Sequence, residues 1–352
     1  MKRVLFLLFL AVFFANVHCI YKKEYKLSIV VGPNSPWGQA GKYFAENVKK
    51  RTNGKINVRV YYGGQLFAGK QTNEFLLLRN GIADFAIAST INWSSQIKEL
   101  NLFSLPFLFR DYKDIDDVLH SEVGKKIKKD LNRFGVVIIG EWGENGFREI
   151  TNSKKIIKSP EDLRNLKVRV VGSPIFLDIF KALGANPLNM NWGDAQTAFR
   201  QGVVDAQENP IDTIIIPYKV YEFHKYITVW HYTFDPLMFA VCKRTWIQFS
   251  PQDKKIIEEV AKEAMLIEKA YARVGLDDGW AINYLKSKKL PVKIEKPYEF
   301  LKSKGANIHI LTQKEYESFQ KATQKVYKKW ENIIGKTLIE KTQKIVKNND
   351  KK

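Results

Sequence analysis

The stretch YKLSIVVGPNSPWGQAGKYFAENVKKRTNGKINVRVYYGG, residues 25–64, contains one complete strand–helix–strand unit. Residues 25–31 mix apolar and β-favouring side chains and end in a turn cluster rich in Gly and Pro. Residues 37–51 carry apolar side chains at helical spacing and stop at an Asn-Gly pair. Residues 56–62 then alternate as a strand and end at two glycines. This unit predicts that helices and strands alternate in the fold.

The same alternation continues along the chain. It predicts helices over 72–79, 112–132 and 174–183, and strands over 84–88, 136–139, 167–171 and 237–242. Strands that alternate with helices predict an α/β fold around a largely parallel sheet.

Two Ser-Pro pairs, at 159–160 and 250–251, are typical helix starts with Ser as the N-cap. The second opens an apolar-periodic stretch that continues to about Leu285. A helix of that length would run about 50 Å, which exceeds one small domain and indicates an element shared by two lobes. The chain from Lys341 is charged and is expected to fray.

The N-terminus indicates export. Lys2 and Arg3 precede the apolar run 4–17, which is too short to span a bilayer and is typical of a secretory signal peptide. The residues Val17-His18-Cys19 suit a cleavage site, so residues 1–19 are predicted to be removed. Cys19 leaves a lipoprotein signal as an alternative. No later stretch has the ~20 apolar residues that a membrane span needs.

The mature chain would keep about 330 of the 352 residues, which predicts two domains. Cys242 would be its single cysteine, so no intramolecular disulfide can form, and its apolar strand indicates an inert core thiol. The formal charge of +20 is explained either by a generally lysine-rich surface or by an anionic partner. No nucleic-acid-binding module is present, so nucleic acid is not expected as that partner.

Signals for an enzyme are weak. Gly64-x4-Gly69-Lys70 resembles a phosphate-binding loop, but Gln71 stands where magnesium coordination needs Ser or Thr. No nucleophile elbow or dinucleotide fingerprint is found. The mature histidines lack metal-ligand spacing; they are His120, His224, His231 and His309. We therefore expect no catalytic residues, no metal and no cofactor. An exported enzyme and a sensory binding protein both remain open at this point.

Arg169 lies inside the strand 167–171, where the two-residue period places it on one face with Lys167 and Val171. A guanidinium in such a strand must find an anion, because an unpaired buried charge is very costly. That anion is either a ligand or a neighbouring carboxylate of the protein, and Arg148 poses the same question. Trp192 precedes a predicted helix, and Asn209 ends the polar run Gln-Glu-Asn.

Together these features resemble the dicarboxylate-type (DctP) solute-binding proteins of TRAP transporters, the tripartite ATP-independent periplasmic systems. The matching segments follow one another along nearly the whole mature chain: SPWG at 35–38, NGKI at 53–56, GIADFAI at 81–87, FSLPFLF at 103–109, ENGFR at 144–148, LKVRV at 166–170, FKALGANP at 180–187 and GVVDAQENP at 202–210.

The resemblance implies a two-lobed periplasmic-binding-protein clamshell with crossing hinge strands and a long lobe-spanning helix. Its expected segments are lobe I at 20–144 and 235–273, lobe II at 145–234 and 274–335, and a charged tail at 336–352. Crossings are expected near 142–147 and 232–236. It also implies a periplasmic monomer that is not membrane-spanning, binds a small-molecule carboxylate and delivers it to the TRAP membrane permease subunits.

The resemblance further implies roles for single residues. Arg169 matches the arginine that forms a salt bridge with the ligand carboxylate, Arg148 matches an assisting arginine, and Asn209 matches an asparagine that contacts the same carboxylate. A guanidinium fork suits a carboxylate because it makes two parallel charge-assisted hydrogen bonds. Trp192 matches an aromatic residue that packs on the ligand body.

The chain departs from the sialic-acid-binding members, which carry Glu and Arg in the segment that corresponds to 89–93. Here the segment offers uncharged ligand-binding candidates, namely Ser89, Thr90, Asn92 and Trp93. This difference argues against sialic acid. A smaller organic acid fits the remaining residues, whether a C4-dicarboxylate, an oxo acid or a sugar acid.

Overall fold

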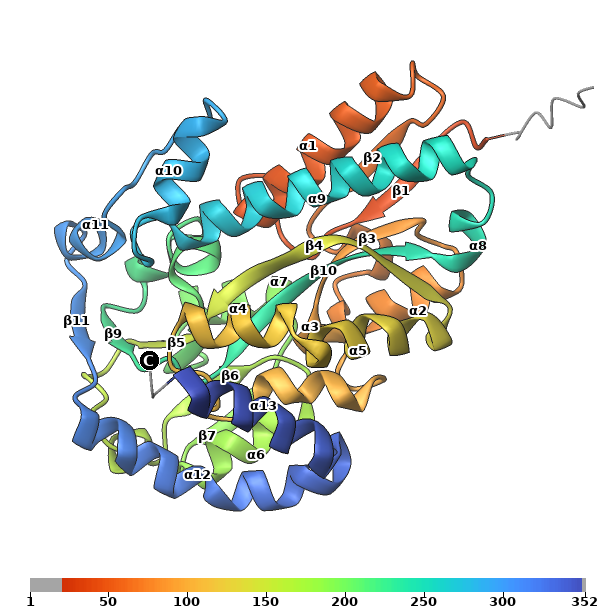
Figure 1. The fold of residues 1–352 in the computed structure, drawn as a ribbon. Helices are drawn as coiled ribbons and strands as arrows, with labels where there is room; N and C mark the ends of the chain where they lie inside the picture. The colour runs from red at the N-terminus through yellow and green to blue at the C-terminus, as the bar shows by residue number, and fades with distance from the viewer. Residues whose placement is uncertain (1–20, 350–352) are drawn as a thin grey trace, which may run out of the picture.

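The computed structural model describes residues 21–349, and its strands form two sheets that lie in different halves of the molecule (Figure 1). The first sheet has the order β2-β1-β3-β10-β4. Its strands are β1 (Tyr25–Ser28), β2 (Val58–Tyr61), β3 (Phe85–Ser89), β4 (Val136–Phe147) and β10 (Phe234–Cys242). β1 pairs in parallel with β2 and β3, whereas β10 pairs antiparallel with β3 and β4.

The second sheet has the order β11-β9-β5-β8-β6-β7. Its strands are β5 (Glu149–Asn152), β6 (Lys167–Val170), β7 (Asn186–Asn189), β8 (Ala206–Asn209), β9 (Tyr226–Val229) and β11 (Asn307–Ile310). β5 pairs antiparallel with β8 and β9, and the other pairs are parallel. The expected largely parallel sheet is therefore wrong where β4, β5 and β10 are involved, because these strands belong to the two chain crossings between the sheets.

The two crossings lie next to each other. β4 leads through Arg148 directly into β5, and residues 230–233 lead from β9 back into β10. Phe147 pairs with Phe234, and the Trp230 indole N–H donates to the Arg148 carbonyl at 3.0 Å. Polar residues on these crossing segments therefore lie between the two sheets.

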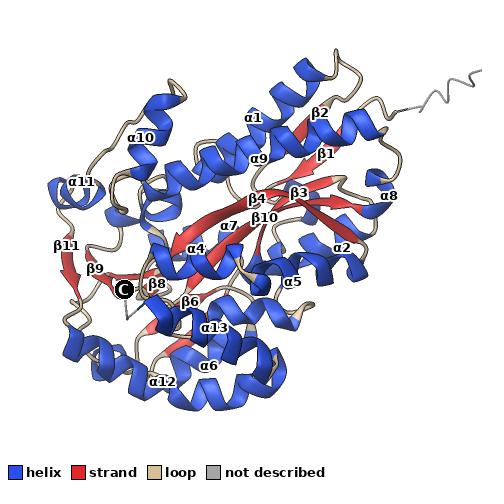
Figure 2. Cartoon of the chain, in the orientation of Figure 1, coloured by secondary structure: helices blue, strands red, loops and turns tan. Residues whose placement is uncertain are grey.

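Helices cover the sheets (Figure 2). Their bounds are α1 (Pro36–Arg51), α2 (Glu74–Arg79), α3 (Thr90–Trp93), α4 (Tyr112–His120), α5 (Glu122–Leu131), α6 (Pro174–Ala182), α7 (Trp192–Arg200), α8 (Lys243–Trp246), α9 (Pro251–Arg273), α10 (Trp280–Ser287), α11 (Pro297–Ser303), α12 (Gln313–Ile334) and α13 (Lys336–Asn349). α9 packs along β4 and α1, and α12 packs on α6. The helical starts predicted at residues 37 and 174 are confirmed within one residue.

The long helix is shorter than predicted. α9 has 23 residues, or about 35 Å, and ends at Arg273 instead of Leu285. Gly275 adopts a φ of +69°, which is not helical, so α10 is a separate helix. A Cβ there would lie 2.1 Å from the Glu295 carbonyl oxygen, so only glycine fits. α9 still contacts β4 and the π-helical turn Ile211–Ile215, which leads away from the second sheet.

Two other helix predictions need correction. The expected helix over 112–132 is broken at Ser121, whose hydroxyl caps α5 by accepting from the Val123 N–H at 3.0 Å. The Ser159-Pro160 start opens only a short 3-10 helix, Pro160–Leu163, although its capping box is complete.

The C-terminal segment is not frayed within the described residues. α13 buries an apolar stripe against α4 and α5, formed by Leu338, Ile339, Thr342 and Val346. Its last turn is fixed by Arg110, which donates to the Val346 carbonyl at 3.1 Å, and by Asn349, which donates to Asp114 at 3.0 Å. The charged residues occupy the opposite face, so a charged composition hid an amphipathic helix.

The predicted signal peptide and its cleavage site, residues 1–19, lie outside the described residues. Between residues 21 and 349, no helix is both long enough and apolar enough to cross a membrane.

Candidate functional site

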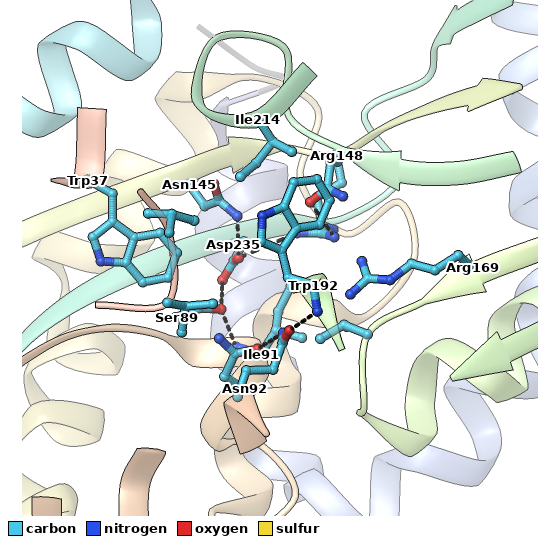
Figure 3. Close-up of a pocket in the computed structure, with 15 residues that line it drawn as sticks. Trp37, Ser89, Ile91, Asn92, Asn145, Arg148, Arg169, Trp192, Ile214 and Asp235 are labelled. Atoms are coloured by element: carbon cyan, nitrogen blue, oxygen red, sulfur yellow. Dashed lines mark hydrogen bonds and ion pairs between the residues drawn. The ribbon is translucent and has the colours of Figure 1, made fainter. Parts of the chain in front are cut away.

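A cleft opens where the two sheets and their crossings meet, and the cavity inside it measures about 30 Å³. Its lining residues come from both halves of the molecule (Figure 3): Val30, Val31, Trp37, Gln71, Ser89, Ile91, Asn92, Asn145, Arg148, Arg169, Val171, Trp192, Asn209, Ile214 and Asp235. Apolar walls with a few convergent polar side chains are typical of a small-molecule site rather than a macromolecular interface.

Arg169 lies on β6 and is only 2% exposed. Its Nε and Nη2 both donate to the Met190 carbonyl, at 3.0 and 2.7 Å, and no ion pair joins it to a carboxylate of residues 21–349. Burial lowers the pKa of Arg169 to about 10, against the pull of the Glu208 charge, so the guanidinium remains charged at neutral pH. The cleft therefore contains a buried cation that lacks an anion.

Arg148 is held very differently. Its Nε and Nη2 bind the two carboxylate oxygens of Glu208, with Nη2 at 2.9 Å from Oε1, and its Nη1 lies 3.5 Å from Asp235. Burial alone would lower the pKa of Arg148, but the charge of Glu208 outweighs it and raises that pKa above its usual value. Arg148 is thus paired within the protein, as a structural ion pair would be.

Asn209 ends β8 and is 4% exposed. Its Oδ1 accepts from Arg148 at 3.0 Å, and its Nδ2 donates to the Gln207 side chain at 2.5 Å. An amide nitrogen carries two hydrogens, so one N–H of Asn209 is left to face the cleft. The Arg148 pair therefore fixes the orientation of this amide.

Trp192 is the first residue of α7, and its indole ring forms one wall of the cleft (Figure 3). The Arg169 guanidinium carbon lies 5.7 Å from the centre of this ring, and Tyr218 packs edge-on against it at 5.0 Å. The backbone N–H of Trp192 donates to Gln71 at 2.8 Å, which ties the start of α7 to the opposite side of the cleft.

Of the four candidates in 89–93, Ser89 and Asn92 line the cleft, whereas Thr90 and Trp93 do not. Trp93 is fully buried, packs on Phe75 with ring centres 5.2 Å apart, and is a core residue. Thr90 is also fully buried, and its hydroxyl lies 3.4 Å from an oxygen of Asp235. Thr90 and Trp93 thus lie behind the cleft lining, because 90–93 forms a helical turn whose successive side chains point in different directions.

Sequence reasoning missed four polar or aromatic lining residues, namely Trp37, Gln71, Asn145 and Asp235. Trp37 and Asn145 lie inside the matching segments SPWG and ENGFR, which could have pointed to them. Asp235 lies on the crossing strand β10, where it accepts from Ser89 at 2.7 Å and from Asn145 at 2.9 Å. Burial raises the pKa of Asp235, and the Arg148 charge opposes this effect.

The weak enzyme signals do not come together in space. Between residues 21 and 349, no group of three or more His, Cys, Asp or Glu side chains is arranged to hold a metal ion. His224 contacts Thr151 at 3.0 Å, and burial lowers its pKa to about 4. Cys242 is a buried free thiol. Gln71, after the phosphate-loop-like segment, bonds to Asn92 and Trp192 across the cleft.

Similarity to known proteins places the chain in a family. The family described as bacterial extracellular solute-binding protein, family 7 (DctP) matches residues 27–333. A TRAP periplasmic solute-binding protein from Ralstonia eutropha, solved with bound (S)-2-acetolactate, shares 46% identity at a TM-score of 0.87, covering 93% of this chain and 100% of that one. Another from Sulfurospirillum deleyianum, solved with succinate, shares 31% identity at a TM-score of 0.79, covering 92% and 98%.

Among curated relatives, the C4-dicarboxylate-binding protein DctB of Bacillus subtilis is 27% identical over 90% of this chain and 84% of its own length. These structural relatives share the two-lobed α/β architecture, which confirms the predicted fold class. The family is one of solute-binding proteins, and the members compared here bind carboxylates. The chain belongs to family 7 of the bacterial extracellular solute-binding proteins, the DctP family of TRAP transporters.

Proposed function

We propose that this protein captures a small organic acid in the periplasm and delivers it, chemically unchanged, to the membrane subunits of a TRAP permease. The observation that carries the proposal is Arg169, a buried guanidinium that faces the cleft without a carboxylate partner among the described residues. A ligand carboxylate would supply the missing anion through a two-pronged contact. Asn209 and the Trp192 ring would complete the contacts at that end of the ligand.

The ligand class follows from the relatives and from the side chains that line the cleft. The relative from Ralstonia eutropha binds a short hydroxy-oxo acid, and the one from Sulfurospirillum deleyianum binds a four-carbon diacid. We infer that this chain takes an acid of similar size. Removal of the signal peptide 1–19 would release the protein, as a monomer, into the periplasm.

A thermal-shift screen of short hydroxy, oxo, sugar and dicarboxylic acids tests the proposed function. An acid at ~100 times its dissociation constant should stabilise the fold by roughly 2.7 kcal/mol. The acid recovered from the complex should be unaltered, and its conversion into a product would instead identify an enzyme. Uptake into vesicles that contain the membrane subunits should require the binding protein; uptake that proceeds equally without it would contradict delivery.

The Trp192 wall gives a prediction about affinity. Trp192→Ala should weaken binding of the acid found in the screen by ~1–3 kcal/mol, because the ligand loses apolar contact area. Isothermal titration calorimetry measures this change. Trp280→Ala is the matched control, since Trp280 lies on α10, is 38% exposed and does not line the cleft. Equal affinities of the Trp192 variant and the wild type would show that this wall is assigned wrongly.

Closure of the two lobes gives a second prediction. Three contacts join segments on opposite sides of the cleft: Gln71 with the Trp192 N–H, Tyr218 with the Gly32 N–H, and Ser94 with Ser173. We propose that lobe I (20–144 and 235–273) and lobe II (145–234 and 274–335) move toward each other when ligand binds. Helix α9 would bend as the cleft closes. Small-angle scattering should show a smaller radius of gyration at saturating ligand. An unchanged radius would exclude closure, and Arg169→Ala at the same ligand concentration is the unliganded control.

A further inference from the structure

The positive and negative side chains around the cleft are not paired one to one. Two cations line it, Arg148 and Arg169, and two carboxylates approach them, Glu208 and Asp235. Both carboxylates are bound to Arg148, so Arg169 is the lining cation that is left, within residues 21–349, for an incoming anion. The cleft can therefore neutralise one ligand carboxylate but contains no cation for a second.

Asp235 is fixed in place at the centre of the cleft. Figure 3 shows its carboxylate between Ser89 and Asn145, with Arg169 and Trp37 on opposite sides of the view. One of its oxygens accepts from Ser89 at 2.7 Å and the other from Asn145 at 2.9 Å, while Arg148 lies 3.5 Å away. With 1% exposure and these partners, the carboxylate cannot turn away from a ligand that fills the cleft.

The remaining donors are neutral. The indole N–H of Trp192 is buried and makes no hydrogen bond of good geometry, although it interacts with the Tyr218 hydroxyl. The Asn92 side chain uses its oxygen to accept from Gln71 at 2.7 Å, which leaves its NH2 group facing the cleft. Such donors suit a hydroxyl or ketone oxygen, and the nearby side chains Val30, Val171 and Ile214 suit carbon.

We propose that Asp235 makes this site selective for monocarboxylates with an uncharged hydroxy or oxo body, and that it excludes dicarboxylates. This inference rests on the proposed function and on Arg169 as the carboxylate anchor. With one ligand carboxylate at Arg169, a second would enter a water-poor space beside Asp235. Two carboxylates in such a space repel each other or must share a proton, which disfavours the diacid.

Pairs of acids that differ only at the far end of the molecule test this selectivity without any variant. The pairs are 4-oxopentanoate with succinate, 3-oxobutanoate with malonate, and gluconate with glucarate. In the first two pairs a methyl group is replaced by a charged oxygen of nearly the same size. Calorimetry on the full mature protein at pH 8, where every probe is fully ionised, should show the monocarboxylate of a pair binding at least tenfold more tightly.

Asp235→Asn keeps the shape of the side chain and removes its charge. In this variant, the ratio of the affinity for the monocarboxylate to that for the diacid should fall at least tenfold. The main reason is tighter binding of the diacid. Asp130→Asn is the matched control, because it changes the net charge equally on α5, outside the cleft, where Asp130 pairs with Lys126. It should leave the difference as in the wild type. If Asp235→Asn does not fold, the wild-type comparison can still overturn the proposal.

The possible failures are distinguishable. A wild-type protein that binds succinate, malonate or glucarate at least as tightly as its partner would overturn the role of Asp235 and leave the proposed function standing. An Asp235→Asn variant that folds and keeps the wild-type preference would also overturn it. Failure of every acid in the three pairs to bind would contradict capture of a small acid, and the selectivity proposal with it.

Discussion

Arg169→Ala is expected to weaken binding of the carboxylate ligand by about 3–5 kcal/mol, or roughly a hundred- to several-thousand-fold in affinity. In the closed cleft the guanidinium and the ligand carboxylate are both shielded from water, so removal of one leaves the other as an unpaired buried charge. The free protein should stay folded, because Arg169 forms no ion pair within the described structure and its protein acceptor is the single carbonyl of Met190. Calorimetry on the folded variant measures the loss.

Two further variants make this test specific. Arg169→Lys should recover only part of the affinity, since a lysine keeps the charge but cannot make the two-pronged contact. Arg133→Ala controls for net charge, because its side chain is 76% exposed outside the cleft. Binding by Arg169→Ala within threefold of the wild type would end the assignment of this residue as the anchor.

Arg148→Ala is expected to act on stability, lowering the free energy of unfolding by about 3–5 kcal/mol even without ligand. The substitution leaves Glu208 fully buried without its cation and removes the 3.5 Å neighbour of Asp235. The Tyr232 hydroxyl donates to Glu208 at 2.6 Å but cannot replace a charge. Urea unfolding of the ligand-free protein measures the change.

The control for Arg148 is the same measurement on Arg169→Ala, which should unfold close to the wild-type midpoint. A folded Arg148→Ala variant with wild-type stability and greatly reduced affinity would contradict this division of roles. In that case Arg148 would serve the ligand directly, and the pair with Glu208 would matter little to the fold.

The sequence does not tell which of Arg148 and Arg169 binds a ligand and which pairs with a carboxylate of the protein. The three-dimensional arrangement distinguishes the two roles. Each arginine lies in a strand-like segment among apolar residues, so strand periodicity predicts burial and a need for an anion for both. Glu208 reaches Arg148 because β5 pairs antiparallel with β8, with Ile150 opposite Glu208. A pairing between strands about 60 residues apart leaves no trace in local patterns.

The other differences between prediction and structure have separate causes. Apolar periodicity predicts a helix from Pro251 to beyond Gly275. The positive φ of Gly275 interrupts it, and α9 ends at Arg273. The family resemblance makes Trp93 a ligand-binding candidate together with Ser89, but the turn of α3 points the indole into the core. A single acidic residue in an apolar strand does not by itself predict a site. Asp235 becomes a candidate only in the fold, where Ser89 and Asn145 donate hydrogen bonds to its carboxylate.

The central claim is that a buried guanidinium captures a ligand carboxylate, and one calorimetric comparison on the unmodified protein tests it most directly. The acid identified in the screen is titrated beside its primary amide, which keeps the shape of the molecule and removes the charge. An amide cannot form the charge-assisted pair with Arg169, so it should bind at least a hundredfold more weakly than the acid. An amide that binds within threefold of the acid would contradict recognition through the carboxylate.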